Sequence, residues 1–437
     1  MMSFDGTQSA PQSRTEIERI TFLGHFGAGN LGNECTLQAA IERTLRRWPQ
    51  ASILCACTDP EDVGARHNIP AFHWKPGPTP LPDSEQAGAA VRRRGPAALF
   101  RIARRILREF AHIAICFRIL SRSDMLIVCG TGVVCDFLTG PGGWPYDLFK
   151  WSALAALCGS RVLFLGVGVG PINHPVSRWL IKRALGFADY RSYRDEESRQ
   201  YLESIGFNTN RDSVCPDVAF GLSKDLFRSD GDRMGQKPVI GLGLKGFAGT
   251  GEANTYQDYL GIMTNFVFWL CEQDYDVRLL TGDIHHDKQV TEDVVAAIKG
   301  RFTVQGQVAA EPALTVEQLV RQLNATDLVI SPRFHNLVLA SALNKPIIAL
   351  SDHPKLDSLM AGFDLSEYCL PIGTLRLDSL TELFQRSWND AERIKARIRG
   401  KTEKYREALD EQYAAAFAKA ERHHGGTFVG ASRVSGN

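Results

Sequence analysis

The chain has 437 residues, of which 44% are hydrophobic, and this length exceeds what a single core normally supports. Its 50 lysines and arginines balance 49 aspartates and glutamates, so a formal net charge of +1 gives no support for a nucleic-acid partner. The ten cysteines show no C-x-x-C pair and no ordered spacing with histidines, which argues against a disulfide framework or a zinc site, and we expect no metal.

The polar segment 1–15 lacks the apolar core of a secretory signal, and no run of about 18 uncharged apolar residues occurs, so we expect a cytoplasmic protein.

Strand-like segments alternate with helical ones along the chain, a pattern typical of parallel sheets built from βαβ units. Strands are predicted at 20–23, 52–57, 125–129, 162–167 and 189–193, and a second series at 239–244, 277–280, 328–331 and 347–350. The polar segment 222–237 between the two series predicts a linker. We therefore predict an α/β fold with two Rossmann-like doubly wound domains, 16–225 and 237–385, whose facing carboxyl edges form a cleft. A helical tail is predicted at 390–424.

A glycine-rich loop follows the first predicted strand and precedes a helix. Gly27, Gly29 and Gly32 form a G-x-G-x-x-G pattern that also contains Asn30. In dinucleotide-binding proteins an acidic residue about 20 positions further on binds the ribose. Asp59 comes later than this and precedes a proline, as in a turn. The pattern therefore favours another ligand, or tight packing, over NAD.

The segment 97–120 has the pattern of a basic amphipathic helix. Its apolar residues recur at helical spacing and arginines flank them: Leu99, Ile102, Ile106, Phe110, Ile113, Phe117 and Leu120, with Arg101, Arg104, Arg105 and Arg108. Such a helix is typical of proteins that contact an anionic membrane surface. A helix docked on its own domain, with a solvated arginine face, accounts for the same pattern.

Two loops of the first domain are candidates for lining the cleft. Gly130, Gly132 and Asp136 follow the strand predicted at 125–129 and place flexible backbone at the carboxyl edge, either around a ligand or in an ordinary turn. Trp144 and Tyr146 follow in a segment rich in glycine and proline. Aromatic rings there either stack on a sugar ring or serve as a lid, and we take both as candidate acceptor residues.

Cationic side chains follow strands of both domains. Arg194 ends the strand predicted at 189–193, and either binds an anion across the cleft or pairs with Asp217. Lys245 and Lys355 follow strands of the second domain, where they either contact phosphate or remain solvated surface charges.

Arg333 and His335 follow the strand predicted at 328–331. Arginine is a permanent planar cation suited to carboxylate or phosphate, and histidine transfers protons near neutral pH. The alternative is a helix-capping arginine and a core histidine. Their position at the carboxyl end of a strand, where open α/β sheets bind ligands, favours a functional pair.

The ordered set of these motifs resembles the polysaccharide pyruvyl transferase family over about 20–370. The motifs that carry the resemblance are Gly27–Gly32, Gly130–Gly132 with Asp136, Gly168–Pro171, Arg194–Ser198, Pro216–Asp217, and Arg333–His335 with Ala340 and Pro346. The chain departs from the family pattern at Asn33, where an aspartate is usual, and at Thr131, where a glycine is usual. Glu34 is a candidate substitute for the missing acid.

The resemblance implies a glycosyltransferase-B-like fold and transfer of a pyruvyl group from phosphoenolpyruvate to a saccharide as a ketal, without a cofactor. It implies that Arg333 and His335 are catalytic and that Arg194 binds the donor. We add Lys245 and Lys355 to the donor site, because phosphoenolpyruvate carries a carboxylate and a phosphate. The first domain is then the acceptor side and the second the donor side.

Two alternatives remain open at this point. One is a nucleotide-sugar-dependent glycosyltransferase of the same fold, and the other is a non-catalytic binding homologue. A membrane-facing helix 97–120 favours a lipid-linked saccharide acceptor on the inner face of the membrane.

Overall fold

The computed structural model describes residues 17–77, 96–137, 139–227, 237–246, 256–299 and 307–421, and side chains of helix α3 from residue 103 onward. The segment 1–15 and most of the linker expected at 222–237 lie outside the described residues.

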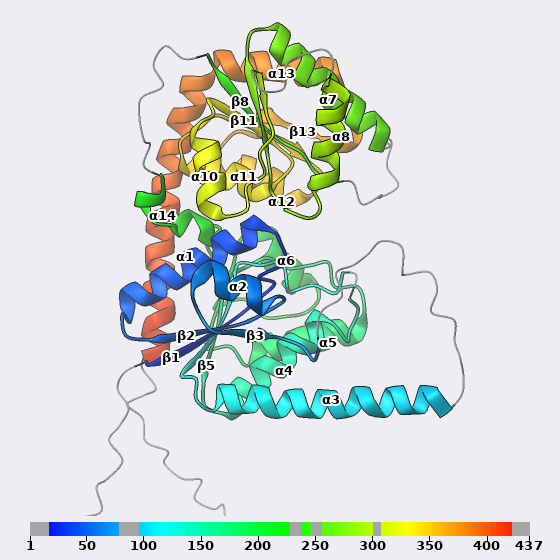
Figure 1. Ribbon diagram of the computed structural model, residues 1–437. Coiled ribbons are helices and arrows are strands. Elements are labelled where there is room, and N and C mark those ends of the chain that lie inside the picture. The colour runs from blue at the N-terminus through cyan, green and yellow to red at the C-terminus, as the bar shows by residue number, and fades with distance from the viewer. Residues whose placement is uncertain are drawn as a thin grey trace, which may run out of the picture.

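The first domain is a seven-stranded parallel sheet in the order β3-β2-β1-β4-β5-β6-β7 (Figure 1). Its strands are β1 (Arg19–Leu23), β2 (Ser52–Cys57), β3 (Ala71–His73), β4 (Met125–Cys129), β5 (Arg161–Val167), β6 (Tyr190–Tyr193) and β7 (Ser213–Val214). Its helices are α1 (Leu31–Arg47), α2 (Pro60–His67), α3 (Pro96–Leu120), α4 (Trp144–Leu157), α5 (Pro175–Gly186) and α6 (Glu196–Ser204).

The second domain is a six-stranded parallel sheet in the order β10-β9-β8-β11-β12-β13. Its strands are β8 (Val239–Gly243), β9 (Asp276–Leu280), β10 (Val308–Ala309), β11 (Leu328–Ser331), β12 (Ile347–Ser351) and β13 (Cys369–Pro371). Its helices are α7 (Tyr256–Glu272), α8 (Lys288–Ile298), α10 (Val316–Asn324), α11 (Phe334–Ala342), α12 (Pro354–Gly362) and α13 (Leu377–Asn389). The predicted α/β fold with two Rossmann-like domains is confirmed.

The central strands and the helix starts follow from local sequence. Every residue of β4 and β12 is buried, as expected for apolar runs in a parallel sheet that is covered on both faces. Helix α1 begins after Asn30, whose side chain accepts hydrogen bonds from the N–H groups of Gly32 and Asn33. Asp195 caps α6 in the same way, with Ser198 N–H as the donor. These caps fix where each helix starts relative to the carboxyl edge of the sheet.

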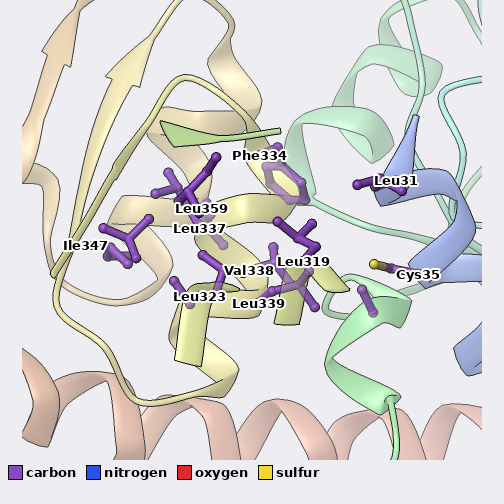
Figure 2. Close-up of a cluster of buried hydrophobic side chains, with 14 of the residues drawn as sticks. Leu31, Cys35, Leu319, Leu323, Phe334, Leu337, Val338, Leu339, Ile347 and Leu359 are labelled. Carbon is purple, nitrogen blue, oxygen red and sulfur yellow. The ribbon is translucent and has the colours of Figure 1, made fainter. Parts of the chain in front are cut away.

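The two domains share one apolar core where α1 meets the second domain. Figure 2 shows Leu31 and Cys35 of α1 on one side, and Phe334 and Leu319 of the second domain on the other, within one buried cluster. Backbone hydrogen bonds cross the same boundary, from Leu31 N to Gly282 O at 3.2 Å and from Ile284 N to Gly29 O at 2.8 Å. The glycine-rich loop is therefore held directly against the second domain.

A single long helix, α14 (Ala391–Glu421), forms most of the segment expected as a helical tail. It leaves the second domain and runs back along the first, as the orange and red helix of Figure 1 shows. Phe417 packs on Trp48 with ring centroids 4.6 Å apart, and Glu421 pairs with Arg47 at 2.6 Å. Among the described helices, none is both long enough and apolar enough to cross a membrane.

Candidate functional site

A cavity of about 710 Å³ lies where the carboxyl edges of the two sheets face each other. Loops after β1, β4 and β5 and the start of α6 form its first-domain wall, and the starts of α11 and α12 form its second-domain wall. Its polar and aromatic lining residues include His25, Asn30, Asn33, Trp144, Arg194, Glu197, His335, His353 and Lys355.

A buried carboxylate, Asp217, lies between an arginine and a histidine of this cavity. Its Oδ2 is 3.7 Å from both Arg194 Nη1 and His335 Nε2. This distance suits an ion pair but exceeds a normal hydrogen bond, and neither Oδ2 nor Nε2 has a hydrogen-bond partner within the described residues. Burial by itself raises the pKa of Asp217, but the charges of His335 and Arg194 outweigh it and hold that pKa below its usual value. A histidine of the second domain thus faces a fixed negative charge of the first.

The imidazole of His335 is positioned by a glycine of the first domain. A Cβ on Gly32 would lie 1.9 Å from His335 Nδ1 and 2.3 Å from Cγ, so no larger residue fits there without moving the ring. On another side, the ring of Phe334 packs edge-on against the imidazole, with centroids 5.2 Å apart. His335 is therefore confined between the two domains, with 16% of its side chain exposed.

Lys355, at the start of α12, lies among other cations. Burial lowers its pKa to about 8, and the nearby charges of Arg194 and Lys245 act in the same direction. Asp352 opposes this effect, and Arg333 adds to it more weakly. An anion bound beside Lys355 would relieve this repulsion.

Arg333 and Lys245, which we predicted as donor-binding residues, are not among the residues that line the cavity. Arg333 Nε lies 3.1 Å from both carboxylate oxygens of Asp287, which is buried. Lys245 pairs with Asp352. The structure therefore brings Arg194 and Lys355 to the cavity, while Arg333 and Lys245 act on it through their charges.

The glycine-rich loop uses its backbone groups within the protein. Gly27 N–H donates to Glu34 Oε1 at 2.9 Å, and Gly32 N–H donates to Asn30 Oδ1 at 3.0 Å. Gly29 has a φ of 77°, a left-handed conformation that glycine adopts most readily. These contacts use backbone N–H groups of the loop and of the start of α1 within the protein, and the loop also lies against the second domain.

Asn33, where the family pattern has an aspartate, lines the cavity, and its Nδ2 donates to the His25 carbonyl at 2.8 Å. Glu34 does not take the place of that acid. It is buried outside the cavity lining, with Oε2 3.1 Å from His67 Nε2. The cavity therefore has an amide where a carboxylate was expected.

The loop after β4 contributes backbone to the cavity through Gly130 and Gly132. The Asp136 carboxylate is not part of the lining. It accepts hydrogen bonds of 2.8 to 3.0 Å from the backbone N–H groups of Asn173 and His174. Burial raises the pKa of Asp136, but these N–H groups outweigh it and lower that pKa overall. Asp136 therefore supports the loop after β5.

The two candidate acceptor aromatics occupy different places. Trp144 lines the cavity, stacks on Trp74 at a centroid distance of 3.6 Å, and meets His25 edge-on at 5.7 Å. Tyr146 instead donates its hydroxyl to Glu109 of α3 at 3.0 Å and is not among the lining residues. Burial lowers the pKa of His25 to about 4, so this ring is neutral at pH 7.

His25, Glu197 and His353 line the cavity but were missed as candidates in the sequence. For the two histidines a usable signal existed, because His25 follows β1 and His353 follows β12, at the carboxyl edge that singled out His335. Within the residues that the structure describes, no group of three or more His, Cys, Asp or Glu side chains is placed to hold a metal ion.

A family model described as polysaccharide pyruvyl transferase matches residues 30–354 of this chain. This range includes Arg194, Asp217 and His335, whereas His25 and Lys355 of the cavity lie just outside it. No curated protein is significantly similar to the chain in sequence.

Several solved structures share the fold at low sequence identity. UDP-GlcNAc 2-epimerase from Neisseria meningitidis bound to UDP-GlcNAc is 12% identical, with a TM-score of 0.55 over 92% of this chain and 100% of that one. Anabaena HepE in complex with UDP and glucose is 13% identical, with a TM-score of 0.56 over 92% and 100%. A glycosyltransferase from Rickettsia africae is 11% identical, with a TM-score of 0.56 over 93% and 98%. The predicted glycosyltransferase-B-like fold is confirmed.

Proposed function

This chain belongs to the polysaccharide pyruvyl transferase family, and we propose that it moves the pyruvyl group of phosphoenolpyruvate onto two hydroxyls of a saccharide, forming a pyruvate ketal and releasing phosphate. The observation that carries the proposal is the convergence of Arg194, Lys355 and His335 on one cavity. Two cations beside a proton-transferring group suit a donor with a carboxylate and a phosphate.

Arg194 and Lys355 are the proposed donor-binding residues that reach the cavity. The lowered pKa of Lys355 supports this assignment, because a cluster of like charges with one depressed lysine favours a bound polyanion. Arg333 and Lys245 strengthen the positive potential from their carboxylate-paired positions. We propose that Arg333 and Lys245 organise the donor site through their ion pairs and do not contact the donor directly throughout the reaction.

His335 is the proposed base for the saccharide hydroxyl. With Asp217 facing Nε2, the imidazolium that forms on proton uptake is stabilised electrostatically. The hydroxyl oxygen bonds to the central carbon of the enol, and the methylene takes one proton from water and becomes a methyl group. The proton held by His335 returns to water, so the proton count balances. A second hydroxyl then bonds to the same carbon as the C–O bond to phosphate breaks, and its proton leaves with the phosphate. No electron acceptor or donor enters this sequence.

Trp144 supports a saccharide acceptor, because it lines the cavity with the part of its ring that is not stacked on Trp74, and tryptophan rings bind the apolar side of sugars. We propose that the acceptor is lipid-linked and that the enzyme works at the cytoplasmic face of a membrane. Tyr146 has no direct part in this proposal, since its hydroxyl is bound to Glu109.

A nucleotide-sugar-dependent transferase is the second candidate, and one observation favours it. A hollow of about 600 Å³ lies beside α12, lined in part by Asp352 and Asp357. An acidic residue binds the ribose hydroxyls in dinucleotide-binding doubly wound folds. No lysine or arginine is among the described residues that line this hollow, so it offers less to a diphosphate than the main cavity does.

Ligand-induced thermal stabilisation separates the candidates without knowledge of the acceptor. A ligand present at ~100 times its dissociation constant and bound only to the folded state stabilises by about 2.7 kcal/mol. We expect phosphoenolpyruvate to stabilise the wild type and Lys288→Gln, a control at an exposed lysine of α8, but not Lys355→Gln. Stabilisation by UDP-glucose alone would favour the nucleotide-sugar transferase. Binding of phosphoenolpyruvate without phosphate release across a panel of saccharides would favour a non-catalytic homologue.

A further inference from the structure

Helix α3 presents large apolar side chains that the described part of the chain leaves uncovered. Leu107 is 73% exposed, Phe110 67% and Ile106 51%, and Phe117 is 46% exposed. Ile106, Phe110 and Phe117 are spaced by four and seven residues, so they share one stripe of the helix, with Leu107 beside it. Four large apolar side chains within one short segment form a contiguous patch, whereas the exposed apolar residues of soluble proteins are normally scattered singly over the surface.

A separate face of α3, roughly a quarter turn around the helix from the stripe, supplies its docking contacts. His112, Cys116 and Leu120, each four residues apart, are buried against the domain. His112 Nε2 lies 3.1 Å from the His73 carbonyl. The exposed stripe is therefore not needed to attach α3 to its own domain.

The exposed apolar surface continues onto the two neighbouring helices, which lie on the same side of the first domain as α3 (Figure 1). At the end of α4, Leu157 is 75% exposed, and the next residue, Cys158, directs its thiol to the Phe117 carbonyl at 3.9 Å. On α5, Trp179 is 52% exposed, and Phe187 directly after the helix is 39% exposed. We call these exposed side chains of α3, α4 and α5 the α3–α5 face.

The charged residues of α3 and α5 are mostly basic, although Arg178 and Lys182 of α5 donate to the carbonyls of Ile172 and Ile205. Helix α3 contains five arginines and one acid, and α5 contains three basic residues and no acid: Arg101, Arg104, Arg105, Arg108 and Arg118 with Glu109, and Arg178, Lys182 and Arg183. Glu109 is already engaged, since its Oε1 accepts from Lys150 Nζ at 2.9 Å. The whole chain has a net charge of only +1, so this concentration of cations is local.

We propose that the α3–α5 face binds the surface of an anionic phospholipid bilayer. The apolar stripe of α3 would enter the boundary between headgroups and acyl chains, and the flanking arginines would contact lipid phosphates. Trp179 has the amphipathic ring that prefers this interface. Contact is interfacial, because none of the described helices is apolar and long enough to span the bilayer.

A second copy of the chain fits this face less well than a bilayer does. In a two-fold symmetric contact the same patch meets itself, so the arginines of α3 would approach one another. Like charges brought together in an interface cost free energy, whereas anionic lipid supplies the opposite charge.

Helix α4 links this face to the cavity. Trp144 at its start lines the cavity, and Leu157 at its end belongs to the α3–α5 face. Fourteen residues at 1.5 Å each make α4 about 21 Å long. If the proposed function holds, a saccharide attached to a lipid headgroup reaches the cavity over roughly that distance. The bilayer contact itself does not depend on the donor chemistry.

Sedimentation with vesicles tests the proposal. We expect the wild-type protein to bind vesicles of phosphatidylcholine with phosphatidylglycerol, to bind pure phosphatidylcholine weakly, and to lose binding as salt rises. Each basic residue near an anionic surface contributes about 1 kcal/mol, or about fivefold in binding. Reversing Arg104, Arg105 and Arg108 to Glu should therefore lower the partition coefficient at least about 100-fold. The pair Ile106→Ser and Phe110→Ser should also weaken binding. The controls are Lys224→Glu with Lys288→Glu, two exposed lysines elsewhere, and Leu314→Ser, an exposed leucine of the second domain.

Quenching of tryptophan fluorescence by brominated acyl chains gives a second readout. Vesicle binding should produce quenching that Trp179→Phe removes in part. The proposal is overturned if the wild type stays in solution with anionic vesicles at low salt, or if the arginine and apolar variants bind like the controls. It is also overturned if the apolar pair converts a dimer to a monomer while vesicle binding is unchanged, since the face would then be a protein interface. Donor binding and phosphate release are measured separately, so failure here leaves the pyruvyl transfer proposal standing.

Discussion

Replacing Gly32 by alanine tests whether the position of His335 controls turnover. Gly32 does not have a left-handed φ, so alanine suits the backbone. The added Cβ would lie 1.9 Å from His335 Nδ1, whereas non-bonded heavy atoms prefer about 3.5 Å, so the ring must retreat by roughly 1.6 Å. A misplacement of about 1 Å in a catalytic group can lower turnover about 100-fold. We expect a loss of that order.

The matched control is Gly132→Ala, in the first-domain wall of the same cavity. A Cβ there would meet no heavy atom within 4 Å. We expect Gly132→Ala to keep turnover within a few-fold of the wild type. Both variants should bind phosphoenolpyruvate with near wild-type affinity in the thermal assay, because neither removes a cation of the donor site.

A double-mutant cycle makes the test sharper. If Gly32→Ala acts through the imidazole, it should cause no further loss in a His335→Ala background, since the group that it displaces is already gone. A folded Gly32→Ala variant with full turnover would refute the reasoning. Equal further losses in both backgrounds would mean that Gly32 matters for a reason other than His335.

The remaining predictions concern three charged groups. Lys355 should be charged below pH 8 and neutral above it, so the affinity for phosphoenolpyruvate should fall about 25-fold between pH 7.5 and pH 9.5. The donor phosphate is already fully ionised in this range and does not contribute to the change. In binding titrations, Lys355→Arg should flatten this pH profile. Asp217→Asn removes the charge that faces His335, so turnover should fall at least about tenfold with donor binding kept, and a pH-rate profile unchanged from wild type would contradict this. Arg333→Ala leaves the buried carboxylate of Asp287 without its cation, with only the backbone N–H groups of Gly246, Gly282 and Asp283 as donors. Urea unfolding should therefore show a loss of roughly 3 kcal/mol that Asp287→Asn in the same chain partly restores.

Sequence patterns predicted the central strands better than the edges. The predicted bounds of β2, β4 and β11 match the structure, because strands buried on both faces require continuous apolar runs. The edge strands β3, β7, β10 and β13 were missed. Each has only two or three residues, and an edge strand pairs on one side only, so it needs no such run.

The sequence predicted the candidate site only to the extent that the carboxyl ends of the predicted strands show which loops lie together. Arg194, His335 and Lys355 follow β6, β11 and β12, and the structure places all three around the cavity. The engagement of Arg333 by Asp287 was not predictable, because the two residues are 46 positions apart and meet only where the loops after β9 and β11 come together at the carboxyl edge of the sheet. The same holds for Tyr146, whose partner Glu109 lies on α3.

The chemistry of the cavity is divided between the domains. Asp217 and Arg194 belong to the first domain, and His335 and Lys355 belong to the second. The 3.7 Å gaps around Asp217 Oδ2 are too long for hydrogen bonds, and the cations on the two walls repel each other. An anion bound between Arg194 and Lys355 would offset that repulsion. Each domain therefore holds only part of the charged groups that the proposed donor site and its base require.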